Sequence, residues 1–254
     1  MSFWFDLKDA VSSFPFYKSA SSRSLSQAMK FLLGLVLLLT VVLSIRLSFS
    51  AFYGINAISD WMIQSLPEIT VTQGQASSAV QQPFKIEALD KQFIFILDTT
   101  GVTQEIPNEY PSGILVMQKK VLFKQDAFQK RVYDLSQVSG LVVNKETIGK
   151  LEQVVKTWII PLLLLGLFIY LFIARLIQVL FFTLMSLVIN AAGGIGLSYK
   201  ALFVIGIYAL VPCSFLGLLV ALIGLPVPWF APVYLTTYLA YLLIGILQCK
   251  KETP

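Results

Sequence analysis

The stretch TWIIPLLLLGLFIYLFIARLIQVLFFTLMSLVINAA, Thr157–Ala192, carries a single charged residue, Arg175. As one helix it would be roughly 53 Å long, against about 30 Å for the hydrocarbon core of a bilayer. Two spans would each be too short, and no glycine or proline lies between Gly166 and Gly193 to reverse the chain. The pattern therefore predicts one long membrane helix, with Arg175 about 27 Å along it, near the opposite boundary of the bilayer.

The composition is that of an integral membrane protein. Of 254 residues, 56% are hydrophobic and only 13% are charged, and the mean hydropathy is +0.76, which is outside the range of soluble domains. There is no histidine, and the two cysteines, Cys213 and Cys249, lie in or at the end of apolar segments. These counts exclude histidine-based acid–base chemistry, zinc sites of Cys/His type and a disulfide framework. We expect no cofactor, and no nucleic-acid partner, because the net charge of +5 forms no clustered basic face.

Three further apolar segments predict helices long enough to cross a membrane. The first begins after Lys30, and it is too long and too far from the amino terminus for an ordinary signal peptide. Its helix is expected to continue beyond the bilayer as an amphipathic stem until Pro67. The predicted fold class is an α-helical integral membrane protein with four transmembrane helices and a small extracytoplasmic α+β domain between the first and second. Its predicted parts are a cytoplasmic aromatic arm (1–30), spans at 31–51, 157–192, 201–223 and 229–248, an outer domain with its helical stem (52–156) and a cytoplasmic tail (249–254).

The distribution of charge predicts which side each part faces. Four crossings put both termini on one side, and lysine and arginine collect on the cytoplasmic side of membrane proteins. The residues on that side are Lys8, Lys18, Arg23, Lys30, Lys200, Lys250 and Lys251. The region 52–156 holds ten basic and eleven acidic residues, so it has no bias that would keep it inside. We expect both termini in the cytoplasm; five spans with an external carboxy terminus are the alternative.

The outer region has the pattern of a small sheet followed by a helix. Short segments rich in Ile, Val and Phe and bounded by turn residues predict strands: EITVTQG, PFKIEAL, QFIFILDTTG, GILVMQK and KVLFKQD. QASSAVQQ (75–82) is predicted to be a polar loop, and ETIGKLEQVVKTW (146–158) has helical spacing that leads into the second span. About one hundred residues suffice for one modest core.

The segment FILDTTG, Phe95–Gly101, resembles three catalytic motifs. These are the Asp-Thr-Gly of aspartic proteases, the phosphorylated aspartate of P-type pumps and the Asp-x-x-Gly of GTPases. Each match lacks its context: a second catalytic aspartate, the neighbouring lysine or a phosphate loop. We interpret the segment as a strand followed by a turn, in which Asp98 accepts local amide hydrogen bonds and Gly101 takes a positive φ.

Ionisable groups are scarce in the apolar segments. Arg46 and Arg175 are expected to anchor their helices at the headgroups, and a buried charge that holds an anionic headgroup or a partner is the alternative for Arg175. Pro212 is expected to kink the third span. The arm is predicted to be an interfacial helix broken near Pro15, with its aromatic side chains at headgroup level. The candidate interaction or anchoring residues are Arg46, Asp98, Gly101, Arg175 and Pro212, and no catalytic, cofactor-binding or metal-binding residue is expected.

Several ordered segments together resemble a bacterial family of multi-pass membrane proteins of unknown function. They are FYKSASSRSLSQAMKFLL, SLPEITVTQGQ, PFKIEALDKQFIFILDTTG, YDLS and LSYKALFVIGIYALVP, which span nearly the whole chain. Some members of that family are described as maltodextrin-utilisation membrane proteins. The resemblance implies a bacterial inner-membrane location and a non-enzymatic accessory role, and it carries over no catalytic residue.

These observations favour an accessory or scaffold protein of the cytoplasmic membrane. Its outer domain is expected to bind a partner protein or a ligand, while the spans contact the lipid bilayer and other membrane proteins. The alternative is a transporter or channel component, linked to sugar uptake, with Arg175 and the Pro212 kink near the pathway. A membrane-bound hydrolase that uses Asp98 is the least favoured function.

Overall fold

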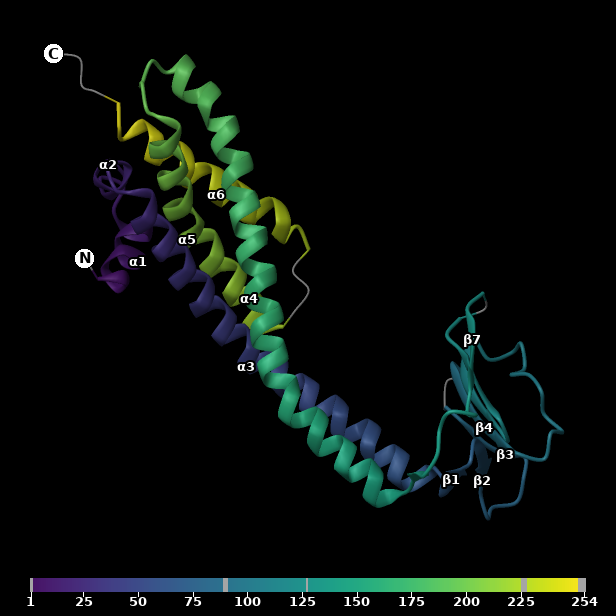
Figure 1. The fold of residues 1–254 in the computed structure, drawn as a ribbon. Coiled ribbons are helices and arrows are strands. Elements are labelled where there is room, and N and C mark those ends of the chain that lie inside the picture. The colour runs from purple at the N-terminus through teal and green to yellow at the C-terminus, as the bar shows by residue number, and fades with distance from the viewer. Residues whose placement is uncertain (1, 89–90, 127, 225–227, 251–254) are drawn as a thin grey trace. The chain divides into compact units, whose positions relative to one another are not determined.

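The computed structural model describes residues 2–88, 91–126, 128–224 and 228–250, which form two units (Figure 1). The helical unit comprises the described residues of Met1–Ala51 and Trp158–Pro254. The sheet unit comprises those of Phe52–Thr157. Two long helices contribute residues to both units.

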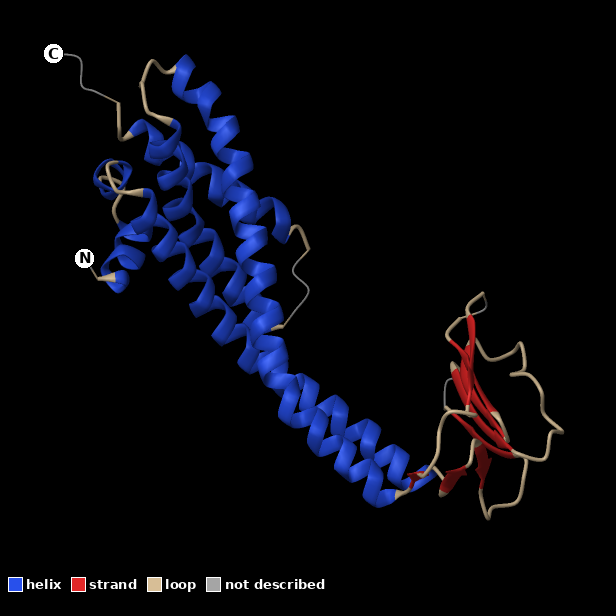
Figure 2. Cartoon of the chain, viewed as in Figure 1, coloured by secondary structure: helices blue, strands red, loops and turns tan. Residues whose placement is uncertain are grey.

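The described residues form six helices, shown in blue in Figure 2. Four of them are long and apolar enough to cross a membrane: α3, α4, α5 and α6. The strands lie between α3 and α4 in the sequence. The bounds of the helices are α1 Phe3–Ser12, α2 Phe16–Ser21, α3 Leu25–Ser65, α4 Lys145–Ala192, α5 Tyr199–Ile223 and α6 Phe230–Leu247.

Both long helices are continuous. The apolar stretch 157–192 belongs to α4, which has 48 residues and passes through Pro161 without ending. The helix α3 has 41 residues, so it begins before and ends well beyond the predicted span 31–51. It ends at Ser65, close to Pro67, because a proline disfavours helical conformation in the residue before it.

The sheet unit contains two sheets. In the larger one the strand order is β3-β4-β5-β6-β7; β4 and β5 are parallel and the other neighbours antiparallel. The smaller one has the order β2-β1-β8 and is antiparallel. The strands are β1 Ile69–Thr72, β2 Gln75–Ser77, β3 Phe84–Glu87, β4 Phe93–Asp98, β5 Ser112–Met117, β6 Lys120–Lys124, β7 Lys130–Asp134 and β8 Leu141–Val143.

One loop prediction is wrong in part. The first three residues of QASSAVQQ form β2 and pair with β1, with Ala76 opposite Val71. Ala76 is buried, while its neighbours Gln75 and Ser77 are exposed. A three-residue strand with one apolar side chain is too short to show an alternating pattern in the sequence.

The strand β4 is the centre of the sheet unit, because both of its faces are covered. Phe95 and Leu97 belong to a core that includes residues of β1, whereas Ile94 and Ile96 pack on the other face with Ile106 of the following segment. That segment, 99–111, is the connection that two adjacent parallel strands require. A strand covered on both faces has a continuous apolar sequence, as FIFIL does.

In the helical unit the first part of α5 is buried on every side. All residues from Ala201 to Ser214 are buried, within a cluster to which the arm, α3, α4 and α6 contribute. Gly206 has no side chain, so α4 can approach α5 closely at this point. A Cβ added at Gly206 would lie only 3.2 Å from Val179 of α4. An α-helix that is apolar all round lies in a protein core or in a bilayer, and other parts of the same unit cover this part of α5.

The amino-terminal arm is part of this core. The helices α1 and α2, separated near Pro15 as predicted, pack against α5. Phe16 and Tyr17 are buried, and the Tyr17 hydroxyl donates to the carbonyl of Ala10 at 2.8 Å. Only part of the aromatic set, including Trp4, is exposed.

Gly245 of α6 packs closely against the arm, and its substitution tests the position of the arm. A Cβ at Gly245 would lie 2.8 Å from both the Tyr17 ring and Ile205. Gly245→Ala should therefore destabilise the helical unit by about 1–3 kcal/mol through overpacking. The measurement is thermal unfolding of the purified protein in detergent.

The matched control is Gly217→Ala in α5, where the nearest atom to an added Cβ is the Phe230 ring at an ordinary 3.8 Å. This variant should unfold at or above the wild-type temperature, because alanine is the better helix former. Equal unfolding temperatures for both variants would contradict the packing of Tyr17 on α6.

Candidate functional sites

The turn after β4 uses the whole carboxylate of Asp98. Its Oδ1 accepts hydrogen bonds from the Thr100 amide (2.9 Å), the Thr100 hydroxyl (2.6 Å) and the Gly101 amide (3.2 Å). Its Oδ2 accepts from the Thr103 amide at 2.5 Å. Gly101 has a φ of 85°, a conformation that glycine adopts without strain. Asp98 and Gly101 therefore shape this turn together.

Electrostatics at Asp98 favour the ionised form. Burial of the carboxyl raises its pKa, but the hydrogen bonds from Thr100 and Thr103 outweigh burial and lower the pKa to about 2. A general acid needs a raised pKa, so this environment is unsuited to that role. Among the described residues, no group of three Asp, Glu or Cys side chains lies close enough to hold a metal ion.

Arg175 lies among helices α4, α5 and α6. Its guanidinium donates to the Gln178 side chain at 3.1 Å and to the Tyr234 hydroxyl, and it sits 5.1 Å from the Tyr234 ring centroid. Tyr234 in turn donates to Gln178 at 3.0 Å. The Arg175 Nε and the Gln178 Nε2 are buried and make no hydrogen bond. The cluster therefore holds a positive charge and spare donors.

The position of Arg175 along the helices follows from the packing of α4 on α5. One turn later in α4, Val179 lies against Gly206 in the first third of α5. Because α4 and α5 run in opposite directions (Figure 1), Arg175 faces the middle of α5. No salt bridge joins Arg175 to a carboxylate of the described residues.

Arg46 and Pro212 are the other two candidate residues in the apolar segments. The Arg46 guanidinium lies against Gly224, which ends α5 with a φ of 80°. A cation at this end is favourable because the last carbonyls of a helix carry partial negative charge. Pro212 lies inside α5 among buried residues, and the helix continues through it. Neither residue joins the Arg175 cluster by a hydrogen bond.

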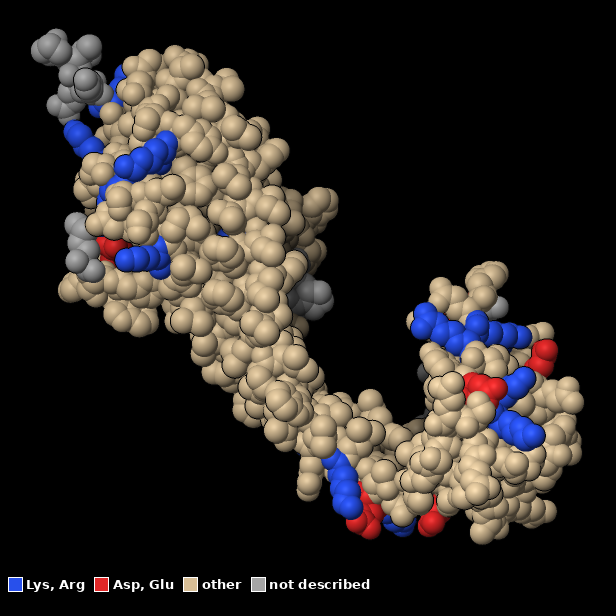
Figure 3. All heavy atoms as spheres, viewed as in Figure 1, with Lys and Arg blue, Asp and Glu red and all other residues tan. Residues whose placement is uncertain are grey.

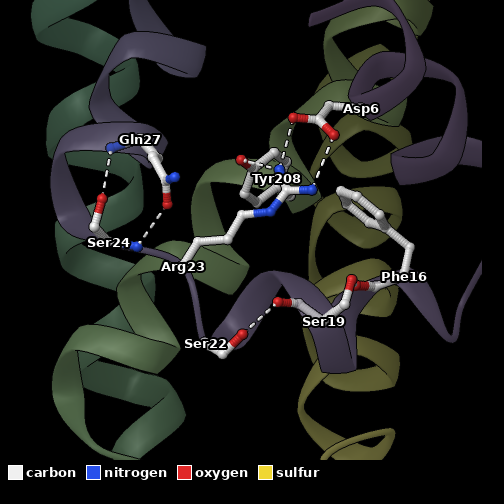
Figure 4. A network of polar contacts seen from close by, with 8 residues as sticks. All are labelled: Asp6, Phe16, Ser19, Ser22, Arg23, Ser24, Gln27 and Tyr208. Carbon is white, nitrogen blue, oxygen red and sulfur yellow. Dashed lines mark hydrogen bonds and ion pairs between the residues drawn. The ribbon is translucent and has the colours of Figure 1, made fainter. Parts of the chain in front are cut away.

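A second buried arginine, Arg23, is held by three elements of the helical unit (Figure 4). Two of its nitrogens donate to the two oxygens of Asp6 in α1, at 2.6 and 2.9 Å. The first also donates to the Tyr208 hydroxyl in α5 at 2.6 Å. The guanidinium lies 5.0 Å from the Phe16 ring centroid and 4.9 Å from that of Tyr208. This buried ion pair joins the arm to α5.

From the sequence, Arg23 is predicted only as one of the charges that set the topology, and its structural role is not recognisable. Its partners are 17 and 185 residues away, and no local spacing relates them. The one available signal is the pattern in α1 that puts Leu7 and Ala10 on a buried face next to Asp6. That pattern does not identify what covers the face.

The sheet unit has an exposed surface on β6 and β7 that combines aromatic and basic side chains. Phe123 and Tyr133 form an edge-to-face pair with centroids 5.4 Å apart, and they are 39% and 52% exposed. Lys and Arg side chains are visible in a row across this unit in Figure 3. A hollow of about 580 Å³ lies beside the pair, lined by Phe93, Gly113, Ile114, Phe123, Lys124, Gln125, Arg131 and Tyr133.

The fold thus defines a protein with four helices suited to crossing a membrane and a β-sheet unit between the first two of them. The chain belongs to the family described as "Protein of unknown function (DUF1189)", which matches residues 4–246 and therefore includes both units. No curated protein and no solved structure matches the chain.

The Asp98 turn gives a testable prediction about the sheet unit. Asp98→Asn replaces an acceptor with an amide donor, so the variant should lose about 1–3 kcal/mol of local stability. Hydrogen–deuterium exchange in 93–117 of the full-length protein should become faster. Because the folded pKa of about 2 lies below the ordinary 3.8, the wild-type contribution is complete above about pH 4 and is lost as the pH falls through 2.

Glu105→Gln is the control, since that side chain is 76% exposed and its one ion-pair contact, to Lys130, is 3.8 Å long. Its exchange should match that of the wild type. Unchanged exchange in Asp98→Asn would contradict the structural role of this carboxylate.

Proposed function

We propose that this protein is a non-enzymatic accessory or scaffold protein of the bacterial cytoplasmic membrane. The four apolar helices anchor it, and the sheet unit lies outside the cytoplasm and binds another membrane or extracytoplasmic protein. The exposed aromatic and basic surface on β6 and β7 carries this proposal. The family description names no function.

The exposed apolar surface of the helices supports membrane insertion. Only 6% of the most apolar window of α4 is buried within the protein. Large exposed side chains continue along it to Val188, which is 72% exposed. Water would make such a surface unfavourable, whereas lipid chains are a good solvent for it.

The positions of the basic residues support the proposed orientation. In the helical unit, the visible Lys and Arg side chains gather towards the part that carries both chain ends (Figure 3). The positive-inside rule assigns that part to the cytoplasm. With four crossings, the segment between α3 and α4 then faces outward.

The surface on β6 and β7 has the composition of a protein-binding site. Aromatic residues and arginine are enriched at interfaces, and binding energy concentrates in such side chains. Phe123, Tyr133 and Arg131 all line the same hollow, and Phe128 in the β6–β7 connection is 96% exposed. A role beside sugar-uptake components, as the resemblance to maltodextrin-utilisation membrane proteins implies, would place the partner among those components.

A transporter or channel component is the second candidate, and the Arg175 cluster favours it. A guanidinium that faces the middle of α5, with an unbonded Nε and without an ion-pair partner among the described residues, is costly in a membrane. Such groups commonly mark a path for an anionic solute. Uptake that depends on Arg175 would favour this alternative over a scaffold.

The orientation can be tested by cysteine labelling in spheroplasts that express the full chain. In a Cys249→Ser background, Phe128→Cys should react with a membrane-impermeant maleimide. Lys8→Cys should react only after the membrane is disrupted, because α1 lies on the cytoplasmic side. Reaction of Lys8→Cys in intact spheroplasts would contradict the proposed topology.

Partner binding can be tested with a photoreactive residue in the native host. Gln125→p-benzoylphenylalanine, at an exposed residue that lines the hollow, should give a discrete cross-linked protein, whereas Ser77→p-benzoylphenylalanine on the smaller sheet should not. Tyr133→Ala should lower the yield of the adduct at least about fivefold, as loss of an interface anchor does. Identical adducts from both positions, or a yield unaffected by Tyr133→Ala, would count against this surface.

A further inference from the structure

A cavity of about 260 Å³ lies beside the Arg23 ion pair, between α1, α3 and α5. Its walls combine aromatic rings with charged and amide groups. Figure 4 shows Asp6, Arg23 and Tyr208 converging, with Gln27 to one side of Arg23. The residues that line the cavity are Phe3, Asp6, Arg23, Gln27, Lys30, Phe31 and Tyr208.

The Arg23 side chain is buried, and one of its nitrogens makes no hydrogen bond. It is 8% exposed, and its Nε makes no hydrogen bond although the other two nitrogens bind Asp6 and Tyr208. A buried N–H donor without an acceptor is unfavourable by about 1–3 kcal/mol. The ion pair fixes the guanidinium, so Arg23 and Asp6 form a fixed polar part of the cavity wall.

Two donors that a ligand can reach line the cavity. Lys30 is exposed, and no ion pair joins its ammonium group to any described carboxylate. Gln27 uses its Oε1 to accept from the Ser24 amide at 3.0 Å, while the Ser24 hydroxyl accepts from the Gln27 amide at 3.2 Å. This reciprocal capping at the start of α3 leaves the Gln27 side-chain NH₂ available.

The charges leave one cation without compensation. The carboxylate of Asp6 balances Arg23, so Lys30 gives the cavity a net charge of +1. The lysine ammonium and the amide NH₂ are both donors, and together they match the oxygens of a phosphate group. The rings of Phe3 and Phe31 offer an apolar wall to the carbon atoms attached to such a group.

We propose that this cavity binds the phosphodiester headgroup of an anionic phospholipid from the cytoplasmic leaflet. Its volume is below the roughly 300–1,000 Å³ typical for drug-sized ligands, which fits a headgroup whose acyl chains stay in the bilayer. The site is built from the arm, the start of the first apolar helix and α5. The inference rests on the membrane insertion and orientation proposed above, and it is independent of partner binding by the sheet unit.

Native mass spectrometry of the full-length protein in mild detergent tests this site. Dioctanoyl phosphatidylglycerol should bind in a 1:1 complex. Dioctanoyl phosphatidylcholine, which has no net charge, should bind at least about tenfold more weakly, because the positive choline group of this lipid offsets the charge-assisted contact of its phosphate with Lys30. Lys30→Gln should weaken phosphatidylglycerol binding by about tenfold, the effect of losing a charge-assisted hydrogen bond.

Lys18→Gln is the matched control, since Lys18 is an exposed lysine of α2 that does not line the cavity. This variant should bind phosphatidylglycerol like the wild type, and unfolding temperatures should show that both variants are folded. Equal weakening by the two substitutions would overturn the site. Equal binding of phosphatidylcholine, or competition by inorganic phosphate at the same concentration as the lipid, would overturn its assignment to an anionic lipid. Topology labelling and cross-linking report on the proposed function separately.

Discussion

The packing of the helical unit centres on the first part of α5, which the rest of the unit covers on every side. Lipid chains would also solvate this apolar surface, so close packing and hydrogen bonds between the helices, rather than exclusion of water, account for the enclosure. The helices α3, α4 and α6 cover part of this surface, and the arm completes the enclosure with Phe16 and Tyr17. The Asp6–Arg23 pair fixes the arm in this position, at the Tyr208 hydroxyl. Breaking one partner of such a buried pair usually destabilises a protein by about 3–5 kcal/mol, because the other charge is left uncompensated. The arm is therefore part of the fold.

The two buried arginines differ in how their charge is compensated. Arg23 has a carboxylate, a hydroxyl and two aromatic faces around it, so its charge is balanced within the unit. Arg175 has the ring and hydroxyl of Tyr234 and the oxygen of Gln178, all of which are neutral. The first arrangement serves assembly of the helices. The second keeps a net charge in an apolar setting, which is why the transporter alternative depends on it.

In the sheet unit an inner strand is buried and an edge strand is exposed. The strand β4 is buried on both faces. In the turn that follows it, both carboxylate oxygens of Asp98 accept hydrogen bonds from nearby residues. The edge strand β7 is exposed along its whole length. Because β6 and β7 belong to one sheet, they can present Phe123 and Tyr133 at low entropic cost. This suits a surface for binding a protein.

The sequence by itself determined the elements whose physics is local. A 36-residue apolar run without glycine after Gly166 had to form one helix, FIFIL had to be a buried strand, and a short aspartate–glycine turn had to follow it. It placed Arg46, Arg175 and Pro212 on their helices but did not identify their neighbours. Only the tertiary structure decided that β2 pairs within a predicted loop, that Arg175 faces the middle of α5, and that the arm packs into the core. These features depend on contacts between residues such as Arg23 and Tyr208, 185 positions apart. Local periodicity records which face of a helix is apolar, but it contains no information about which distant side chain will cover that face.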